Sequence, residues 1–146
     1  MPIVGAYEPS TLQWVADQVA EYEASGGTRS NTLRDSGIPI IVVTMLGAKS
    51  GNVRKIGLMR VEHEGKYALV ASKGGHPSDP GWYLNLLANP SVMIQDGSEA
   101  IDFTVQEITG AERQEWWDRS VEVYPEYAVY EKRTDRVIPI LVASRS

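Results

Sequence analysis

The sequence predicts an α+β protein with a central, mostly antiparallel sheet or barrel of about six strands and three to four helices. Two observations favour this class. Short apolar and β-branched runs are joined by hairpin turns, as in residues 53–71 and 92–107. The strands also do not alternate regularly with helices, as a doubly wound parallel sheet would require. At 146 residues with 42% hydrophobic content, the chain fits one domain with a real core.

An N-terminal helix followed by a flexible linker is expected over residues 1–37. Ser10 and Gln13 have the spacing of a capping box, and apolar residues then recur at helical spacing. Residues 23–37 are polar and rich in Gly and Ser, which is typical of a loop. We therefore expect the barrel in residues 38–146.

The later elements follow from local signals. Asp96-Gly97 is a hairpin turn, and Thr109 with Glu112 marks a helix start. Pro139 indicates that the last strand lies at an edge or carries a bulge. Strands are expected at 38–44, 53–61, 67–71, 92–95, 101–107 and 137–142, and helices at 80–87, 109–123 and 126–133.

Composition excludes several classes of function. A net charge of −5 and a pI near 5.0 argue against nucleic-acid binding. The absence of cysteine excludes disulfides and thiol catalysis, and two histidines alone cannot form an ordinary zinc site. No apolar run approaches the roughly 18 residues that span a bilayer, and the N-terminus lacks signal-peptide features. A cytoplasmic protein is expected.

One basic, glycine-rich stretch stands out in this acidic chain. Residues 47–75 contain six basic and two acidic side chains, a local balance of +4. Such a reversal suggests an anion site formed by Lys49, Arg54, Lys55 and Lys73. The alternative is a solvated basic hairpin. A P-loop is excluded because Ala48 separates glycine from lysine.

Aromatic residues form two further candidate groups. Trp82 and Tyr83, with Asn85, could line a planar ligand, or they could belong to the core. Tyrosines at 124, 127 and 130 recur every three residues. They could form a pocket wall with hydroxyl donors, or a packed amphipathic face.

Taken together, these motifs resemble the deazaflavin-dependent nitroreductases, which use coenzyme F420. The resemblance covers about residues 22–143. It rests on Thr44-x-x-Gly47-x-Lys49-Ser50-Gly51-x-x-Arg54, Ala71-Ser72-Lys73-Gly74-Gly75, Trp82-Tyr83-x-Asn85-Leu86-x-Ala88-Asn89-Pro90 and Tyr124-Pro125-x-Tyr127-x-x-Tyr130. It implies a split β-barrel and hydride transfer from the reduced deazaflavin to a small electron-poor acceptor such as a quinone, enone or nitro compound.

The resemblance also implies residue roles. The cofactor's phosphate and polyglutamate tail would contact Ala48, Lys49, Ser50, Arg54 and Lys55. The ring would lie against Ile56, Gly57, Leu58, Met59, Val70, Ala71, Ser72 and Lys73 on one side, and Gly81, Trp82, Tyr83, Leu84 and Asn85 on the other. The substrate would face Ser72, Tyr124, Tyr127 and Tyr130, with Tyr127 also near the ring.

Departures from the family pattern and open alternatives remain. The family usually has Arg or another long side chain where Ala48 stands and Pro where Gly57 stands, which concerns cofactor affinity. An FMN-dependent split-barrel enzyme and a non-catalytic deazaflavin-binding protein are the alternative functions. The chain is expected to be a monomer or homodimer, with no stable membrane insertion; peripheral contact at the inner face of the membrane is an open alternative.

Overall fold

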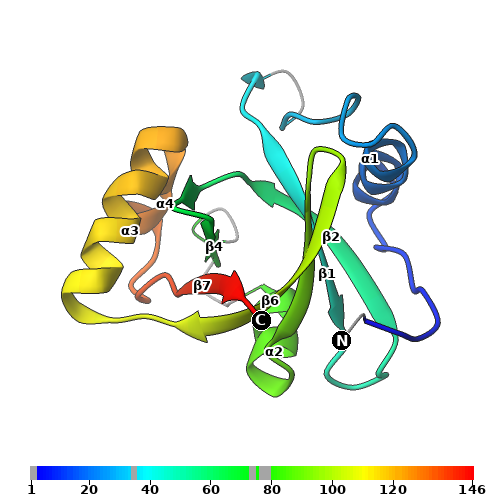
Figure 1. The fold of residues 1–146 in the computed structure, drawn as a ribbon. Helices are drawn as coiled ribbons and strands as arrows, with labels where there is room; N and C mark the ends of the chain where they lie inside the picture. The colour runs from blue at the N-terminus through cyan, green and yellow to red at the C-terminus, as the bar shows by residue number, and fades with distance from the viewer. Residues whose placement is uncertain (1–2, 34–35, 73–74, 76–79) are drawn as a thin grey trace.

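The computed structural model describes residues 3–33, 36–72, 75 and 80–146. Four helices and seven strands lie within this described part (Figure 1). The helices are α1 (Gln13–Ala24), α2 (Gly81–Ala88), α3 (Gly110–Val123) and α4 (Glu126–Arg133). The strands are β1 (Ile40–Leu46), β2 (Val53–Met59), β3 (Glu62–His63), β4 (Lys66–Val70), β5 (Ser91–Asp96), β6 (Glu99–Glu107) and β7 (Ile140–Arg145).

The seven described strands form one curled antiparallel sheet in the order β2-β1-β5-β6-β7-β4-β3. Hairpins join the sequential pairs, as the sequence predicted. The curl brings β2 into contact with β4, although four strands stand between them in the sheet order. The fold is therefore a half-barrel of the split-barrel kind, which confirms the expected fold class.

Alternating residues of the strands are buried on opposite faces of the sheet. On the concave face, Ile41 and Val43 of β1 share a core with Leu69 of β4 and Leu141 of β7, although three strands separate β1 from β4. On the convex face, other residues of β4 and β7 pack under α3 and α4, while those of β1 pack under α1. Burial of both faces explains why these strands are apolar runs without a polar alternation.

Helix α1 is hydrogen-bonded to the turn between β5 and β6. The Tyr22 side chain is buried, and its hydroxyl accepts the Gly97 N–H at 2.7 Å. Gly27 approaches Gly97 so closely that a Cβ at Gly27 would lie 2.5 Å from the Gly97 Cα, and its φ is +78°. Only glycine fits this crossing without strain.

Three local predictions were wrong. Thr109 is the N-cap residue of α3, but its side chain forms no capping hydrogen bond. The Ser10 hydroxyl bonds the Leu12 N–H, and α1 begins at Gln13 without a side-chain cap, so the capping box does not form. Pro139 does not mark an edge strand, because β7 lies between β6 and β4. Proline is tolerated because it directly precedes β7, where its carbonyl accepts the Ala71 N–H at 2.9 Å.

Candidate active site

Two cavities share β2 and α2 as walls. The first, which we call the anion cavity, has a volume of about 360 Å³. The second, the tyrosine cavity, has a volume of about 450 Å³. The anion cavity is lined by Glu8, Gly47, Ala48, Lys49, Ser50, Arg54, Gly81, Leu84 and Asn85. The tyrosine cavity is lined by Leu12, Trp14, Leu33, Gly57, Leu58, Met59, Val70, Ser72, Pro80, Trp82, Tyr124, Tyr127 and Tyr130.

The β1–β2 loop that forms the anion cavity is held by its own hydrogen bonds. The Gly47 N–H donates to the Asn52 carbonyl at 2.8 Å, and the Asn52 N–H donates to the Ser50 hydroxyl at 3.1 Å. The Ala48 N–H donates to Oδ1 of Asn85 on α2 at 2.9 Å. Asn85 therefore fixes the loop against α2, a positioning role that its spacing did not indicate.

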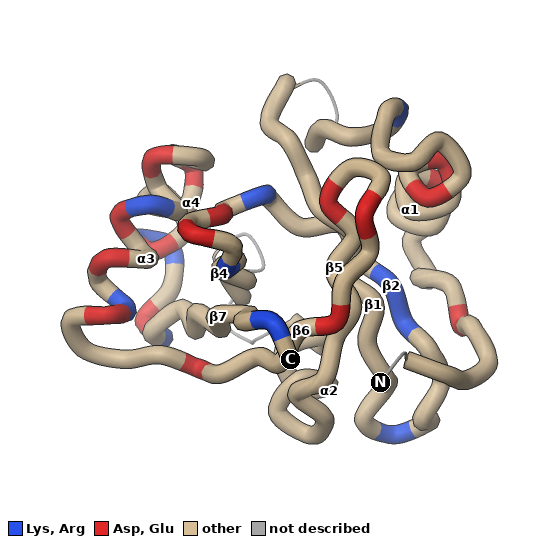
Figure 2. The backbone as a smooth tube through the Cα atoms, in the orientation of Figure 1, with Lys and Arg blue, Asp and Glu red and all other residues tan. Residues whose placement is uncertain are grey.

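Two cations and one carboxylate line the anion cavity. Lys49 lies at the exposed loop, and no ion pair connects it to a carboxylate within the described part of the chain. Arg54 forms an ion pair with Glu8, with 2.7 Å between Nη1 and Oε2. Figure 2 shows the acidic band of the N-terminal segment beside the basic bands of β2. The cavity therefore keeps a net positive charge suited to an anion.

The tyrosine cavity has an apolar lining with a cluster of three tyrosines. The hydroxyls of Tyr124 and Tyr130 are hydrogen-bonded at 3.0 Å. The Tyr127 ring packs edge-on against Tyr124, with centroids 5.0 Å apart. Tyr127 is only 5% exposed, and its hydroxyl has no hydrogen-bond partner among the described residues. A ligand in this cavity could accept a hydrogen bond from that hydroxyl.

Tyr124 and Tyr127 are neutral over the physiological range. Burial, aided by the hydrogen bond with Tyr130, raises the pKa of Tyr124 to about 12. Burial also raises the pKa of Tyr127 well above its ordinary value. A raised tyrosine pKa keeps the proton on the phenol. Tyr124 and Tyr127 are therefore hydrogen-bond donors and not phenolate bases.

Ser72 enters the tyrosine cavity from the end of β4 and is 8% exposed. Arg136 holds the backbone there, because its Nη2 donates to the Ser72 carbonyl at 2.7 Å and its Nη1 to the Ala71 carbonyl at 3.1 Å. A planar guanidinium makes two such bonds at fixed geometry. Arg136, from the segment before β7, thus positions this wall.

The structure brings most of the sequence-predicted site residues to these two cavities, but four described ones line neither. Lys55 points away towards Glu23, with 2.6 Å between Nζ and Oε2. Ala71 is fully buried, Ile56 packs against the concave core, and the Tyr83 hydroxyl bonds Glu107. Lys73 lies outside the described residues. Lys55 lies on the face of β2 opposite Arg54, whereas Ile56, on the same face as Arg54, is covered by core side chains, and Ala71 and Tyr83 are buried.

Sequence reasoning missed lining residues that come from distant segments. Glu8, Leu12 and Trp14 belong to the N-terminal region, Leu33 to the following loop and Pro80 to the start of α2. None lies in a motif, and no local signal could have found them. Their contribution depends on how the N-terminal region packs over β2.

Comparison with known proteins then gives the family. A family model described as F420H(2)-dependent quinone reductase matches residues 14–145. The chain belongs to this family. An F420H(2)-dependent quinone reductase of Mycobacterium tuberculosis is 34% identical over 110 residues, covering 73% of this chain and 74% of the relative. The resemblance inferred from the motifs is thereby confirmed.

Two solved structures are similar to this chain in both sequence and fold. An F420-H2 dependent reductase is 52% identical, with a TM-score of 0.70, covering 73% of this chain and 94% of the other. A second structure, described as a domain-swapped dimer, is 46% identical, with a TM-score of 0.72, covering 92% and 100%. A heme-binding protein of Mycobacterium smegmatis, 12% identical with a TM-score of 0.59, shares only the fold.

The residues present fit a deazaflavin with an anionic arm. The cations Lys49 and Arg54 lie at the anion cavity, whereas the tyrosine cavity is apolar with a buried hydroxyl donor. A Cβ built at Gly81 would meet nothing within 4 Å, so the α2 end of the anion cavity is open. The two cavities thus differ in charge as the two ends of that cofactor do.

Proposed function

We propose that this chain reduces a quinone with reduced coenzyme F420. The observation that carries the proposal is the pairing, along β2 and α2, of a cationic cavity with an apolar tyrosine cavity. Membership of the F420H2-dependent quinone reductase family supports this reading. The bound cofactor would supply the hydride.

In this proposal the anion cavity holds the phosphate and tail of the cofactor. Lys49 and Arg54 provide the charge, and the loop from Gly47 to Asn52, held by Asn85, provides the shape. The ring lies in the tyrosine cavity between Gly57–Met59 of β2 and Trp82 of α2. The acceptor stacks on the ring, on the side that faces the three tyrosines.

The tyrosines stabilise the acceptor oxygen. Reduction of a quinone to a quinol takes a hydride and a proton, and negative charge develops on an oxygen as the hydride arrives. The Tyr127 hydroxyl, which has no hydrogen-bond partner among the described residues, can donate a hydrogen bond to that oxygen. Because burial raises the pKa of both Tyr127 and Tyr124, each phenol retains its proton, and we assign delivery of the final proton to water.

A cofactor titration followed by turnover tests the proposal. Purified protein should quench or shift the fluorescence of oxidised F420 with saturation at micromolar concentration, and F420H2 should then be consumed repeatedly with menadione. Absence of saturable binding would refute the assignment. Binding without multiple turnovers would make the protein a deazaflavin carrier, and a purified protein with a flavin spectrum would favour FMN.

We further propose that the chain can form a homodimer as well as a monomer. The support is the 46% identical relative whose structure is described as a domain-swapped dimer. Size-exclusion chromatography with light scattering at several concentrations distinguishes the two states. A single monomer mass at all concentrations would remove the dimer.

Finally, we propose a cytoplasmic location with peripheral contact at the inner face of the membrane. No helix in the described part of the chain has the length and apolar character needed to cross a bilayer. Leu12 and Trp14 are exposed near the mouth of the tyrosine cavity. Sedimentation with neutral and anionic vesicles tests the contact; protein that stays in the supernatant with both would refute it.

A further inference from the structure

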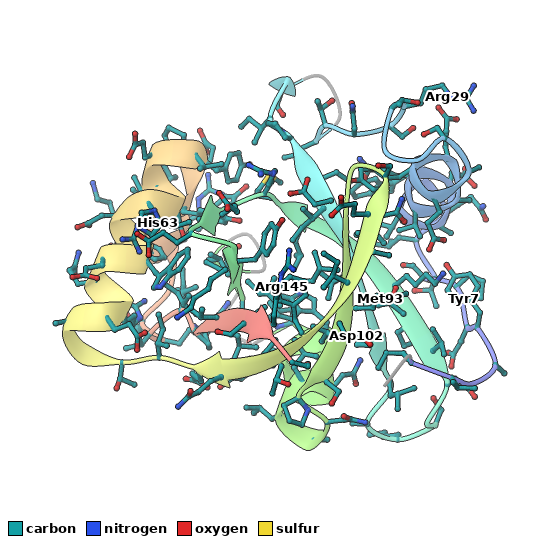
Figure 3. The ribbon with its side chains drawn as sticks, in the orientation of Figure 1. Tyr7, Arg29, His63, Met93, Asp102 and Arg145 are labelled. Atoms are coloured by element: carbon teal, nitrogen blue, oxygen red, sulfur yellow. The ribbon has the colours of Figure 1, made fainter. Side chains whose placement is uncertain are left out.

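The N-terminal segment, residues 6–8, is fastened to the outer edge of β2. The Glu8 N–H donates to the Val53 carbonyl at 2.8 Å, and the Val53 N–H donates to the Ala6 carbonyl at 2.8 Å. Tyr7 pairs with Val53 in a parallel bridge and lies on this edge (Figure 3). These backbone contacts place the Glu8 side chain at the anion cavity.

The Glu8 carboxylate is bound by two side-chain donors that could equally bind the carboxylate of a ligand. Its Oε2 lies 2.7 Å from Nη1 of Arg54, and its Oε1 accepts a hydrogen bond from Nδ2 of Asn52 at 3.1 Å. Each oxygen therefore has its own donor. The pair of donors at positions 52 and 54 is a ready binding site for anionic oxygens, and Asn52 was not among the sequence-predicted site residues.

We propose that Glu8 is an internal counter-anion of the anion cavity, which a phosphate or carboxylate group of the cofactor displaces from Asn52 and Arg54. This inference rests on the proposed function for the identity of the ligand. It adds a residue that sets cofactor affinity and selects for ligands of high negative charge. A ligand with a single charge gains little over the carboxylate that it replaces.

The exposure of the pair makes the exchange feasible. The side chains of Arg54 and Glu8 are 30% and 43% exposed, so water screens their attraction. Glu8 also sits in the same cavity as Lys49, so its charge offsets part of the attraction of that cavity for any other anion. Neutralising Glu8 should therefore strengthen anion binding without disturbing the backbone pairing of residues 6–8.

The test compares Glu8→Gln with a matched control, Glu23→Gln. The Glu23 carboxylate forms an ion pair with Lys55, which follows Arg54 in β2, with 2.6 Å between Oε2 and Nζ. Glu23 lines neither cavity. Both variants change the net charge equally. We expect Glu8→Gln to bind oxidised F420 about three- to tenfold more tightly, the size of one screened charge interaction. Glu23→Gln should stay within about twofold of wild type.

Three ligands separate the sources of the effect. The gain in affinity of Glu8→Gln should appear with the intact cofactor. With a cofactor that keeps the phosphate but lacks the polyglutamate tail, a retained gain assigns the displacement of Glu8 to the phosphate, and a lost gain assigns it to the tail. The gain should vanish with the deazaflavin core that lacks both groups. Unchanged or weaker binding of the intact cofactor by Glu8→Gln, an equal gain in Glu23→Gln, or a gain with the uncharged core would each overturn the inference.

A second probe keeps the inference testable if no deazaflavin binds. Inorganic pyrophosphate is titrated into wild type and Glu8→Gln while the Asn52 side-chain amide is followed by NMR. We expect that amide to shift at several-fold lower pyrophosphate concentration in Glu8→Gln. If it does not shift in either protein, the site does not bind anions and the inference fails, whatever the cofactor proves to be.

Discussion

Replacing Tyr127 by Phe should separate catalysis from stability. The Tyr127 side chain is 5% exposed, and among the described residues its hydroxyl has no hydrogen-bond partner. Removing this hydroxyl therefore loses no hydrogen bond within the described part of the chain. The free energy of unfolding should therefore stay within about 0.5 kcal/mol of wild type or rise.

Turnover should respond in the opposite way. A donor aimed at a developing oxyanion contributes about 2.7–4 kcal/mol to the transition state, so quinone turnover should fall by about a hundredfold. Cofactor affinity should change little, because the cationic groups lie in the other cavity. Urea denaturation, F420 titration and steady-state turnover measure the three quantities.

Tyr67→Phe is the matched control. Tyr67 is also a buried tyrosine, but its hydroxyl donates to Oδ2 of Asp96 at 2.6 Å and it lines neither cavity. Loss of a bond to a charged acceptor should cost about 1.5–3 kcal/mol of stability, with turnover of the folded protein preserved. Full activity in Tyr127→Phe, or a stability loss equal to that of Tyr67→Phe, would refute the role assigned to Tyr127.

Four further changes have defined outcomes. Lys49→Gln and Arg54→Gln should each weaken F420 binding by about tenfold in a fluorescence titration, whereas Lys66→Gln, exposed on β4, should not; equal affinity in all three would remove the anion cavity from the site. Because the pKa of Tyr124 is raised to about 12 and that of Tyr127 is also raised, both phenols stay protonated, and the pH profile of turnover should show no ionisation of these two residues below about pH 10; a loss beginning near pH 8 would contradict this. Gly27→Ala should lower the free energy of unfolding by at least about 2 kcal/mol, since its Cβ would lie 2.5 Å from Gly97, and an unchanged urea midpoint would show that the crossing can relax. Arg136→Gln should raise the KM for quinone and lower stability by about 1.5–3 kcal/mol, with partial rescue in Arg136→Lys; normal kinetics would limit Arg136 to a structural role.

Local sequence signals predicted most elements of the fold. The Asp96-Gly97 turn and the β-branched runs around it gave β5 and β6 within a few residues, and α4 matches its expected bounds. The failures at Ser10 and Pro139 have tertiary causes. Residues 6–8 pair with β2 instead of leading directly into a helix, and the curl places β7 inside the sheet.

The candidate site was predictable where a motif indicates both the residue and the face to which its side chain points. Lys49, Arg54 and the tyrosines line cavities as expected, but Lys55 does not, because adjacent strand residues point to opposite faces. Charge counting cannot make this distinction. Glu8 and Asn52 were missed for another reason. They are 44 residues apart in the sequence, and only the folded chain brings them into contact.

The place of β7 in the sheet has a consequence for folding during synthesis. It pairs with β6 along Phe103–Glu107 and with β4 along Tyr67–Val70, and it is made after both. Until the ribosome has released Ile140–Arg145, the two halves of the sheet have no strand between them, and Leu69 and Val70 of β4 lack the strand with which they pair. Such late, non-local pairing slows folding and exposes strand edges to aggregation. Nascent chains stalled before Ile140 should therefore remain sensitive to protease across β4, and they should become protected only after β7 has emerged.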